Sequence, residues 1–230
     1  MGKEAVLFDF DGVVVNTEPL YERAERKLFE EYGINISEDE WKLFKGISEN
    51  AFYNYIKRRF NIKGPVDVLK KKGRDYLKQE FLEHIDYVDG FLQFYNSIRK
   101  KYRTALVTST SGSVLKWIFE NTKIENMFDI IITSHDVKNT KPHPEPYIKA
   151  CLKLSVKPDK VVAIEDTIVG IKSAISAGID TIGLTTTFSR DEIKEVTRYI
   201  ANNYGEVKYI LDKLEGENVI CQNKKTGLDY

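Results

Sequence analysis

Five short segments of almost continuously apolar residues constrain the fold of this chain more than any other feature. Polar residues flank each segment, and β-branched side chains are common within them; they span residues 5–10, 104–108, 130–133, 160–164 and 181–184. Apolar runs that do not alternate with polar residues are typical of strands covered on both faces. The segments therefore predict a buried parallel β-sheet.

Helical periodicity separates the later apolar segments. It covers residues 114–119, 146–152 and 168–177, and the last of these runs is followed by Gly178, a residue favoured just past a helix end. Strands that alternate with helices form a doubly wound α/β domain. We therefore expect an α/β fold with a Rossmann-like, doubly wound parallel sheet.

One connection is far longer than the others. Between Thr17 and Val88 no strand-like run occurs, and apolar residues recur at helical spacing, for example at Leu20, Ala24 and Leu28. This length is too great for a loop, so we expect a helical domain inserted after the first strand. The predicted division is a core of residues 1–16 and 89–215, a helical cap of residues 17–88, and a polar, patternless tail of residues 216–230. The crossings near 14–19 and 85–91 would act as hinges.

Composition narrows the class of protein. Lys plus Arg number 35 and Asp plus Glu number 35, so the chain offers no basic excess, and nucleic acid is not an expected partner. No apolar run reaches the length of a membrane span, no signal peptide is evident, and Cys151 and Cys221 lie far apart. We expect a cytoplasmic protein without disulfides or membrane contact.

The predicted strands end in polar side chains that can do chemistry. In open α/β sheets, ligands bind beyond the carboxyl ends of the strands. The residues at those ends are Asp9, Asp11, Gly12, Thr108, Ser109, Lys141, Glu165 and Asp166. We expect them to meet on one rim of the sheet.

This set of side chains suits a divalent cation and a phosphate. Four carboxylates against one lysine leave a net charge near minus three, and two like charges 4 Å apart repel by roughly 4 kcal/mol at an effective dielectric of 20. Oxygen ligands favour Mg²⁺. With Mg²⁺ bound, hydroxyls, Lys141 and backbone N–H groups of residues 109–112 could hold a phosphate. One carboxylate could then act as nucleophile and another as proton shuttle.

Each of these residues has an ordinary structural explanation when it is taken alone. Asp11 and Gly12 form a common turn pair, and Asp166 could cap the helix that starts near Ile168. Thr108 could be a strand-end residue and Lys141 a solvated loop residue. The functional interpretation rests on the whole set, which follows one order along the chain and one edge of the predicted sheet.

The same residues resemble the four ordered motifs of the haloacid dehalogenase superfamily. The motifs are residues 9–14, a strand ending in Thr108, residues 141–142 and residues 165–166, and their order and spacing match across residues 4–185. The inserted helices resemble that superfamily's C1 cap. Within them, residues 44–48 are similar to a cap segment of the β-phosphoglucomutase-like subgroup.

The resemblance implies a role for each matching residue. Asp9 would attack phosphorus and also ligate Mg²⁺, and Asp11 would exchange protons with the leaving group and water while its backbone carbonyl binds the metal. Thr108 and Ser109 would bind phosphate oxygens, and Lys141 would neutralise charge. Asp166 would ligate Mg²⁺ directly, with Glu165 nearby or joined through water. Gly12, Gly46 and Glu49 are the further expected substrate contacts.

The expected activity is that of a Mg²⁺-dependent phosphatase acting on a small phosphorylated metabolite through an aspartyl-phosphate. The acid at Asp11 favours phosphate-ester chemistry over dehalogenation within the superfamily. A phosphosugar mutase is the alternative, but the mutases carry an arginine where this chain has Glu49. The other class of function left open is a non-catalytic, phosphate-responsive switch. The substrate and the oligomeric state are not determined.

Overall fold

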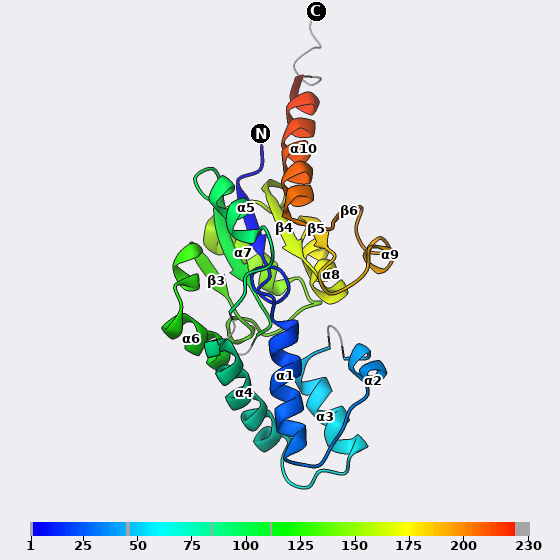
Figure 1. The fold of residues 1–230 in the computed structure, drawn as a ribbon. Coiled ribbons are helices and arrows are strands. Elements are labelled where there is room, and N and C mark those ends of the chain that lie inside the picture. The colour runs from blue at the N-terminus through cyan, green and yellow to red at the C-terminus, as the bar shows by residue number, and fades with distance from the viewer. Residues whose placement is uncertain (1, 45–46, 84, 111, 224–230) are drawn as a thin grey trace, which may run out of the picture.

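A six-stranded parallel sheet forms the centre of the structure, a computed structural model that describes residues 2–44, 47–83, 85–110 and 112–223 (Figure 1). The strands lie in the order β3-β2-β1-β4-β5-β6, and all five neighbouring pairs are parallel. They are β1 (Ala5–Phe8), β2 (Arg103–Val107), β3 (Ile130–Ile132), β4 (Val161–Glu165), β5 (Asp180–Leu184) and β6 (Tyr199–Ala201). The predicted doubly wound α/β fold is confirmed.

Helices cover both faces of this sheet, which explains the unbroken apolar runs. Along β1, Val6 and Phe8 pack into one hydrophobic cluster and Ala5 and Leu7 into another, and all four are fully buried. The first cluster includes residues of α5 (Phe91–Ile98), α6 (Gly112–Asn121) and α10 (Tyr204–Asn223). The second includes residues of α7 (Glu145–Leu154) and α8 (Ile168–Ser176).

Short helices complete the connections of the sheet. A four-residue helix, α9 (Arg190–Ile193), lies between β5 and β6, and 3₁₀ turns lie at Ile124–Met127, Ser134–Asp136 and Pro158–Lys160. The expected end of α8 is present, because Gly178 follows the last turn with φ 79° and its N–H bonds to the Ile175 carbonyl.

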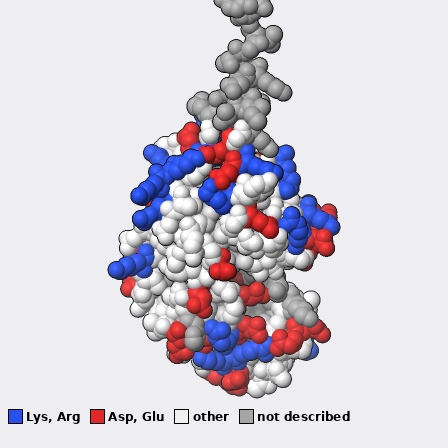
Figure 2. All heavy atoms as spheres, turned by 45° about the horizontal axis from the view of Figure 1, so that its top comes forward, with Lys and Arg blue, Asp and Glu red and all other residues white. Residues whose placement is uncertain are grey.

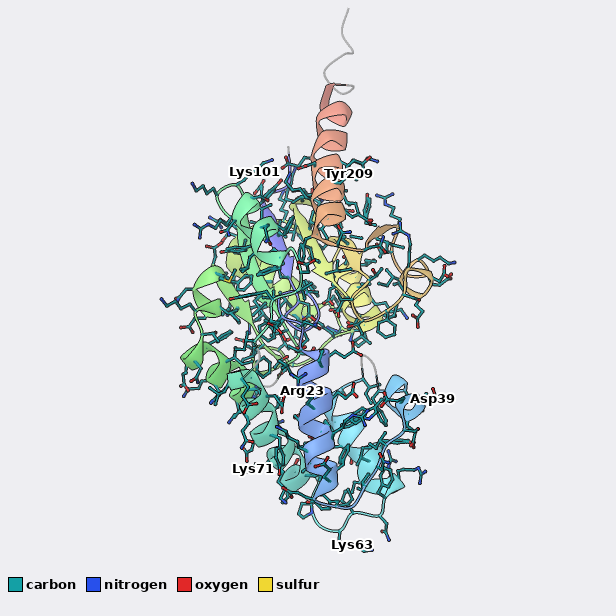
Figure 3. All side chains as sticks on the ribbon, in the orientation of Figure 1. Arg23, Asp39, Lys63, Lys71, Lys101 and Tyr209 are labelled. Atoms are coloured by element: carbon teal, nitrogen blue, oxygen red, sulfur yellow. The ribbon has the colours of Figure 1, made fainter. Side chains whose placement is uncertain are left out.

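Four helices between β1 and α5 form a lobe beyond the carboxyl ends of the strands (Figure 1). This helical lobe consists of α1 (Glu18–Glu30), α2 (Glu38–Lys42), α3 (Glu49–Arg59) and α4 (Val66–Glu83). It holds a hydrophobic cluster of its own, made of Leu28, Phe29, Ile36, Phe52, Tyr53, Ile56 and Leu69. Asp39, Lys63 and Lys71 lie at its periphery (Figure 3). The exact domain boundaries stay a prediction.

The two chain segments that join the lobe to the sheet run side by side. Val15 and Tyr87 form an isolated antiparallel bridge, and the Asn16 N–H donates to the Asp86 carbonyl at 2.9 Å. The Val88 N–H donates to the Val14 carbonyl at 3.1 Å. The two predicted hinge segments are therefore tied to each other by backbone hydrogen bonds, so that a movement at one crossing would involve the other.

The sequence prediction was wrong about the residues after 215. Helix α10 continues through Asn223, so residues 216–223 are helical rather than a patternless tail. Tyr204, Val207, Leu211 and Leu214 bury the first part of α10 against the sheet, and the following residues contain no proline to stop the helix. A helix that is already nucleated extends at low cost, which the polar composition alone did not reveal. Residues 224–230 lie outside the described part.

The surface agrees with the balanced composition. On the face shown in Figure 2, Lys and Arg side chains are interspersed with Asp and Glu and form no continuous basic patch. Within the described ranges, no helix combines the length and the apolar character needed to cross a bilayer.

Candidate active site

The loop after β1 brings two carboxyl groups to the rim of the sheet. Asp9 follows directly on β1, where its N–H donates to the Ile164 carbonyl of β4 at 3.1 Å, and the residue is only 7% exposed. Asp11 lies two residues further, at the start of a turn. Since β1 is central in the sheet, both carboxyl groups lie next to residues delivered by the neighbouring strands β2 and β4.

Lys141 joins these strands at the centre of the site. Its Nζ donates to Asp9 Oδ1 at 2.7 Å, to Glu165 Oε1 at 2.6 Å and to the Val107 carbonyl at 2.8 Å. Burial alone would lower the pKa of Lys141, but the neighbouring Asp9 and Glu165 carboxylates outweigh it and raise that pKa. Lys141 is therefore a buried, permanently charged group beside the predicted nucleophile.

Three carboxylates are placed where they could share a cation. Asp9, Glu165 and Asp166 each offer an oxygen, and these atoms lie within 4.8 Å of one another. Burial first, and then the charges of Asp9 and Glu165, raise the pKa of Asp166 well above its usual range. Oδ1 of Asp166 is buried and has no hydrogen-bond partner in the described chain. A divalent cation fits this donor set, because it would satisfy the orphaned oxygen and offset the repulsion.

Glu165 also positions Lys141. Besides Lys141, its Oε1 accepts a hydrogen bond from the Tyr147 hydroxyl of α7, so that this carboxylate holds the lysine in place. Burial raises the pKa of Glu165. The N-cap of α8 is Thr167, whose side chain accepts from the Gly170 N–H, and not Asp166. The ordinary explanation of Asp166 as a helix cap is therefore excluded.

Gly12 permits the close approach of Asp166. Its φ is 69°, in the left-handed region, and a Cβ at this position would lie 2.0 Å from Asp166 Oδ2. The Gly12 N–H donates to the Val15 carbonyl at 2.8 Å, and its own carbonyl accepts from Thr186 Oγ1. Both backbone groups of Gly12 are engaged within the protein, and its predicted contact with substrate stays a prediction.

Asp11 lies in an environment that raises its pKa toward neutrality. Burial first, and then the charge of Asp9, raise its pKa to about 6, while hydrogen bonds from Thr110 and Thr17 act in the opposite direction. Thr110 Oγ1 donates to Asp11 Oδ2, and Asp11 Oδ1 is buried without a partner among the described residues. A carboxyl group with such a pKa can both give and take a proton.

The predicted phosphate-binding residues follow β2. Thr108 is 4% exposed, its N–H donates to the Ile132 carbonyl, and its Oγ1 accepts from the Thr110 N–H at 3.0 Å. Ser109 is exposed at the surface of the rim. Ser111 lies outside the described residues, so the loop from 109 to 112 is described only in part.

In the helical lobe, Glu49 begins α3 and is paired with an arginine. Arg74 of α4 donates through Nε to Glu49 Oε1 at 2.7 Å and through Nη2 to Oε2 at 2.5 Å. The negative charge of Glu49 is thus paired within the lobe, which the sequence analysis did not foresee. The predicted contact Gly46, and Lys45 beside it, lie outside the described residues.

Several residues of the site escaped the sequence analysis. Tyr147 and Arg74 come from helices, where no local pattern marks a side chain that reaches a distant carboxylate. The Thr187 hydroxyl donates to Asp166, whereas Thr110, whose hydroxyl donates to Asp11, lies in the predicted segment 109–112. Thr187 could have been found, because residues 185–187 form a threonine run just past the carboxyl end of a predicted strand.

Comparison with known proteins identifies the family. The model of the haloacid dehalogenase-like hydrolases matches residues 6–184. A phosphorylated carbohydrates phosphatase of Thermotoga maritima is 36% identical over 182 residues, which are 78% of this chain and 83% of the relative. The yeast 2-deoxyglucose-6-phosphate phosphatase 1 is 31% identical over 96% of each chain.

Solved structures agree with this assignment. A putative β-phosphoglucomutase from T. maritima superimposes with a TM-score of 0.76 at 30% identity, covering 91% of this chain and 99% of the other. A family IA hydrolase of Entamoeba histolytica gives a TM-score of 0.79 at 26% identity, with coverage of 92% and 99%. The chain is an enzyme that belongs to the haloacid dehalogenase-like hydrolases.

Proposed function

We propose that this enzyme hydrolyses the phosphate monoester of a small, hydroxyl-rich molecule, with Asp9 as the nucleophile. The observation that carries the proposal is the buried assembly of Asp9, Lys141 and Glu165 with Asp11 beside it. Lys141 fixes one oxygen of Asp9 at 2.7 Å. The relatives named as phosphatases of sugar phosphates support the substrate class.

The proposed reaction has two steps. An oxygen of Asp9 attacks phosphorus while the bond to the leaving oxygen breaks, and Asp11 donates its proton to that oxygen. Water then attacks phosphorus, Asp11 takes its proton, and the bond to Asp9 breaks to release inorganic phosphate. A pKa of about 6 lets Asp11 serve as acid and base in turn near neutral pH. Lys141 offsets negative charge on Asp9 and on the phosphoryl group, with Thr108 and Ser109 as the phosphate contacts.

Mg²⁺ is the proposed cofactor, held by Asp166, Asp9, the backbone carbonyl of Asp11 and, directly or through water, Glu165. When bound, it would supply positive charge that draws the phosphate dianion toward the acidic rim. The unpartnered Asp166 Oδ1 and the grouping of three carboxylates support this assignment. The helical lobe would close over the substrate as a cap and exclude bulk water.

Two other functions were open at the level of sequence. The relative titled a putative β-phosphoglucomutase keeps mutase activity as the second candidate within this family. Membership of a hydrolase family argues against a non-catalytic switch. A switch would also release phosphate about once per phosphorylation event, whereas an enzyme turns over repeatedly.

The test is phosphate release from a panel of sugar, polyol, acid and nucleotide monophosphates with Mg²⁺, with EDTA, and with excess Ca²⁺. We expect turnover that requires Mg²⁺ and is inhibited by Ca²⁺, because the looser geometry of Ca²⁺ can draw both oxygens of Asp9 away from attack. Full activity in EDTA would contradict the metal site. Faster conversion of glucose 1-phosphate to the 6-phosphate than release of phosphate would favour the mutase.

A further inference from the structure

The Arg74 guanidinium has the geometry to bind an anion, and the carboxylate of Glu49 occupies this binding position. Both parallel hydrogen bonds of the guanidinium go to one carboxylate, at 2.5 and 2.7 Å. The same planar arrangement of donors binds phosphate and substrate carboxylates, because these groups present two oxygens at a similar spacing. The Arg74 and Glu49 side chains are 32% and 37% exposed, so an incoming ligand can reach them.

The pair faces the reaction centre through Tyr21. The Tyr21 hydroxyl interacts with Thr110, the residue that also bonds to Asp11. Tyr21 of α1 packs against the hydrophobic cluster that contains Val13 and Val14 of the loop after β1, and burial first, then Asp11, and then Glu49 raise its pKa. Arg74 interacts mainly with Glu49, and more weakly with Tyr53 and then Tyr21. The remainder of a substrate that extends from the rim into the lobe would therefore meet this pair.

We infer that Arg74 is a specificity-determining residue, a ready-made anion receptor that Glu49 keeps filled, so that the enzyme selects monophosphates with an uncharged remainder. This inference rests on the proposed function and adds the cause of its substrate preference. A second anionic group on the substrate must displace Glu49 from Arg74 and leave that carboxylate unpaired next to the new anion. A hydroxyl-rich remainder can instead bond to the pair without breaking it.

Simple repulsion by Glu49 would give the same preference, but the two explanations differ in what Arg74 does. If Arg74 is the receptor, releasing it by Glu49→Gln creates affinity for a second anion, and removing Arg74 abolishes that gain. If Glu49 acts only by repulsion, the gain survives the loss of Arg74. A double-variant cycle therefore separates the two.

The experiment compares wild type, Glu49→Gln, Arg74→Gln and the double variant. The substrates are matched pairs that differ in a neutral or anionic remainder: glycerol 3-phosphate with 3-phosphoglycerate, and fructose 6-phosphate with fructose 1,6-bisphosphate. We expect Glu49→Gln to raise the relative kcat/KM for the anionic members about tenfold, the size expected for one gained charge-assisted hydrogen bond. Arg74→Gln and the double variant should not show this gain.

Glu38→Gln is the matched control. Glu38 also begins a helix of the lobe after a serine N-cap and pairs with an arginine, Arg26 Nη2 at 2.6 Å, but its side chain is 78% exposed and the partners that shift the pKa of Arg26 all belong to the lobe. This variant should keep the wild-type ratio. Thermal melting of every variant checks that the fold is intact.

Binding is measured separately from turnover by calorimetry in an Asp9→Asn background with Mg²⁺, using the same pairs. If the wild type releases no phosphate from any substrate, the proposed function is refuted, but the binding measurement remains valid. An unchanged binding ratio in Glu49→Gln, or an equal gain in the double variant, would overturn the role of Arg74.

Discussion

The rim of the sheet and the helical lobe hold their charged side chains in different ways. At the rim, Lys141 is 5% exposed and bonded to two buried carboxylates, each at the carboxyl end of a strand. In the lobe, Glu49 and Arg74 come from two separate helices and are each about one-third exposed. Breaking a buried pair costs about 3–5 kcal/mol, whereas exposed pairs contribute about 0–1 kcal/mol. The charged pairs of the rim are therefore costly to change, whereas the pair in the lobe can be changed at little cost in stability.

The largest effect is expected at the rim, from Asp9→Asn. The amide is nearly isosteric with the carboxylate but is a far weaker nucleophile, so turnover should fall by several orders of magnitude. The fold and its melting temperature should be kept, because Glu165 still pairs with Lys141 and one of several mutually repelling carboxylates is removed. Steady-state phosphate release measures the turnover, and thermal melting without Mg²⁺ measures the stability of the fold. Asp39→Asn, at the periphery of the lobe (Figure 3), is the control. Near-wild-type turnover in Asp9→Asn would contradict the mechanism.

The second prediction tests whether the buried ion pairs of Lys141 contribute more to stability than an exposed pair does. Lys141→Met leaves Asp9 and Glu165 without their shared cation, and we expect a loss of about 3–5 kcal/mol in the free energy of unfolding at neutral pH without Mg²⁺. Lys153→Met removes a lysine that lies 3.8 Å from Asp136 and is 45% exposed, and should cost less than about 1 kcal/mol. Equal losses from the two variants in denaturant titrations would contradict the contrast.

A third prediction concerns the one deeply buried acid of the lobe that lacks a cationic partner among the described residues. Glu25 is 7% exposed, Tyr53 donates to its Oε1, and its Oε2 has no partner there. Burial raises its pKa to about 8, with the nearby Glu49 adding to the shift. Because the folded-state pKa is raised, the stabilisation is complete below the unfolded pKa near 4.5 and is lost as pH rises through about 8.

For wild type we expect the free energy of unfolding to fall by about 2–3 kcal/mol between roughly pH 6 and pH 9 as Glu25 loses its proton. Glu25→Gln should flatten this part of the stability curve and melt above wild type at the alkaline end. Glu22→Gln changes an acid of the same helix whose side chain is 40% exposed and paired with Arg26, and this variant should keep the wild-type slope. Parallel pH profiles for wild type and Glu25→Gln would mean that Glu25 is not protonated in the folded lobe.

The smallest effect is expected from the Thr110 hydroxyl, which lowers the pKa of Asp11 through one hydrogen bond. Thr110→Val removes the donor to Asp11 and should raise the pKa of that carboxyl above about 6, by about one unit or less. The limb of the kcat/KM profile that needs protonated Asp11 should move to higher pH. Thr110→Ser keeps the hydroxyl and should restore the wild-type profile. A limb that does not move would show that Thr110 leaves the proton of Asp11 unaffected.

The sequence alone determined the sheet, the inserted helices and the rim. Short, β-branched apolar runs that alternate with helical segments are typical of strands covered on both faces. Parallel strands bring their carboxyl-end residues to one edge, so Asp9, Lys141 and Asp166 were placed together without coordinates. The short strand β6 was missed because three residues carry too little pattern, and the end of α10 was missed because helix extension depends on an already anchored first half.

Only the tertiary structure decided which side chains meet across separate helices. The bond from Tyr147 to Glu165, the filling of Arg74 by Glu49 and the burial of Glu25 beside Tyr53 all join residues at least 18 positions apart. Local periodicity shows which face of a helix is apolar, but the polar partner across a packing interface is set by how the helices are placed against each other. For that reason the sequence located the residues of the rim, while the pairing of charges within the lobe emerged only from the fold.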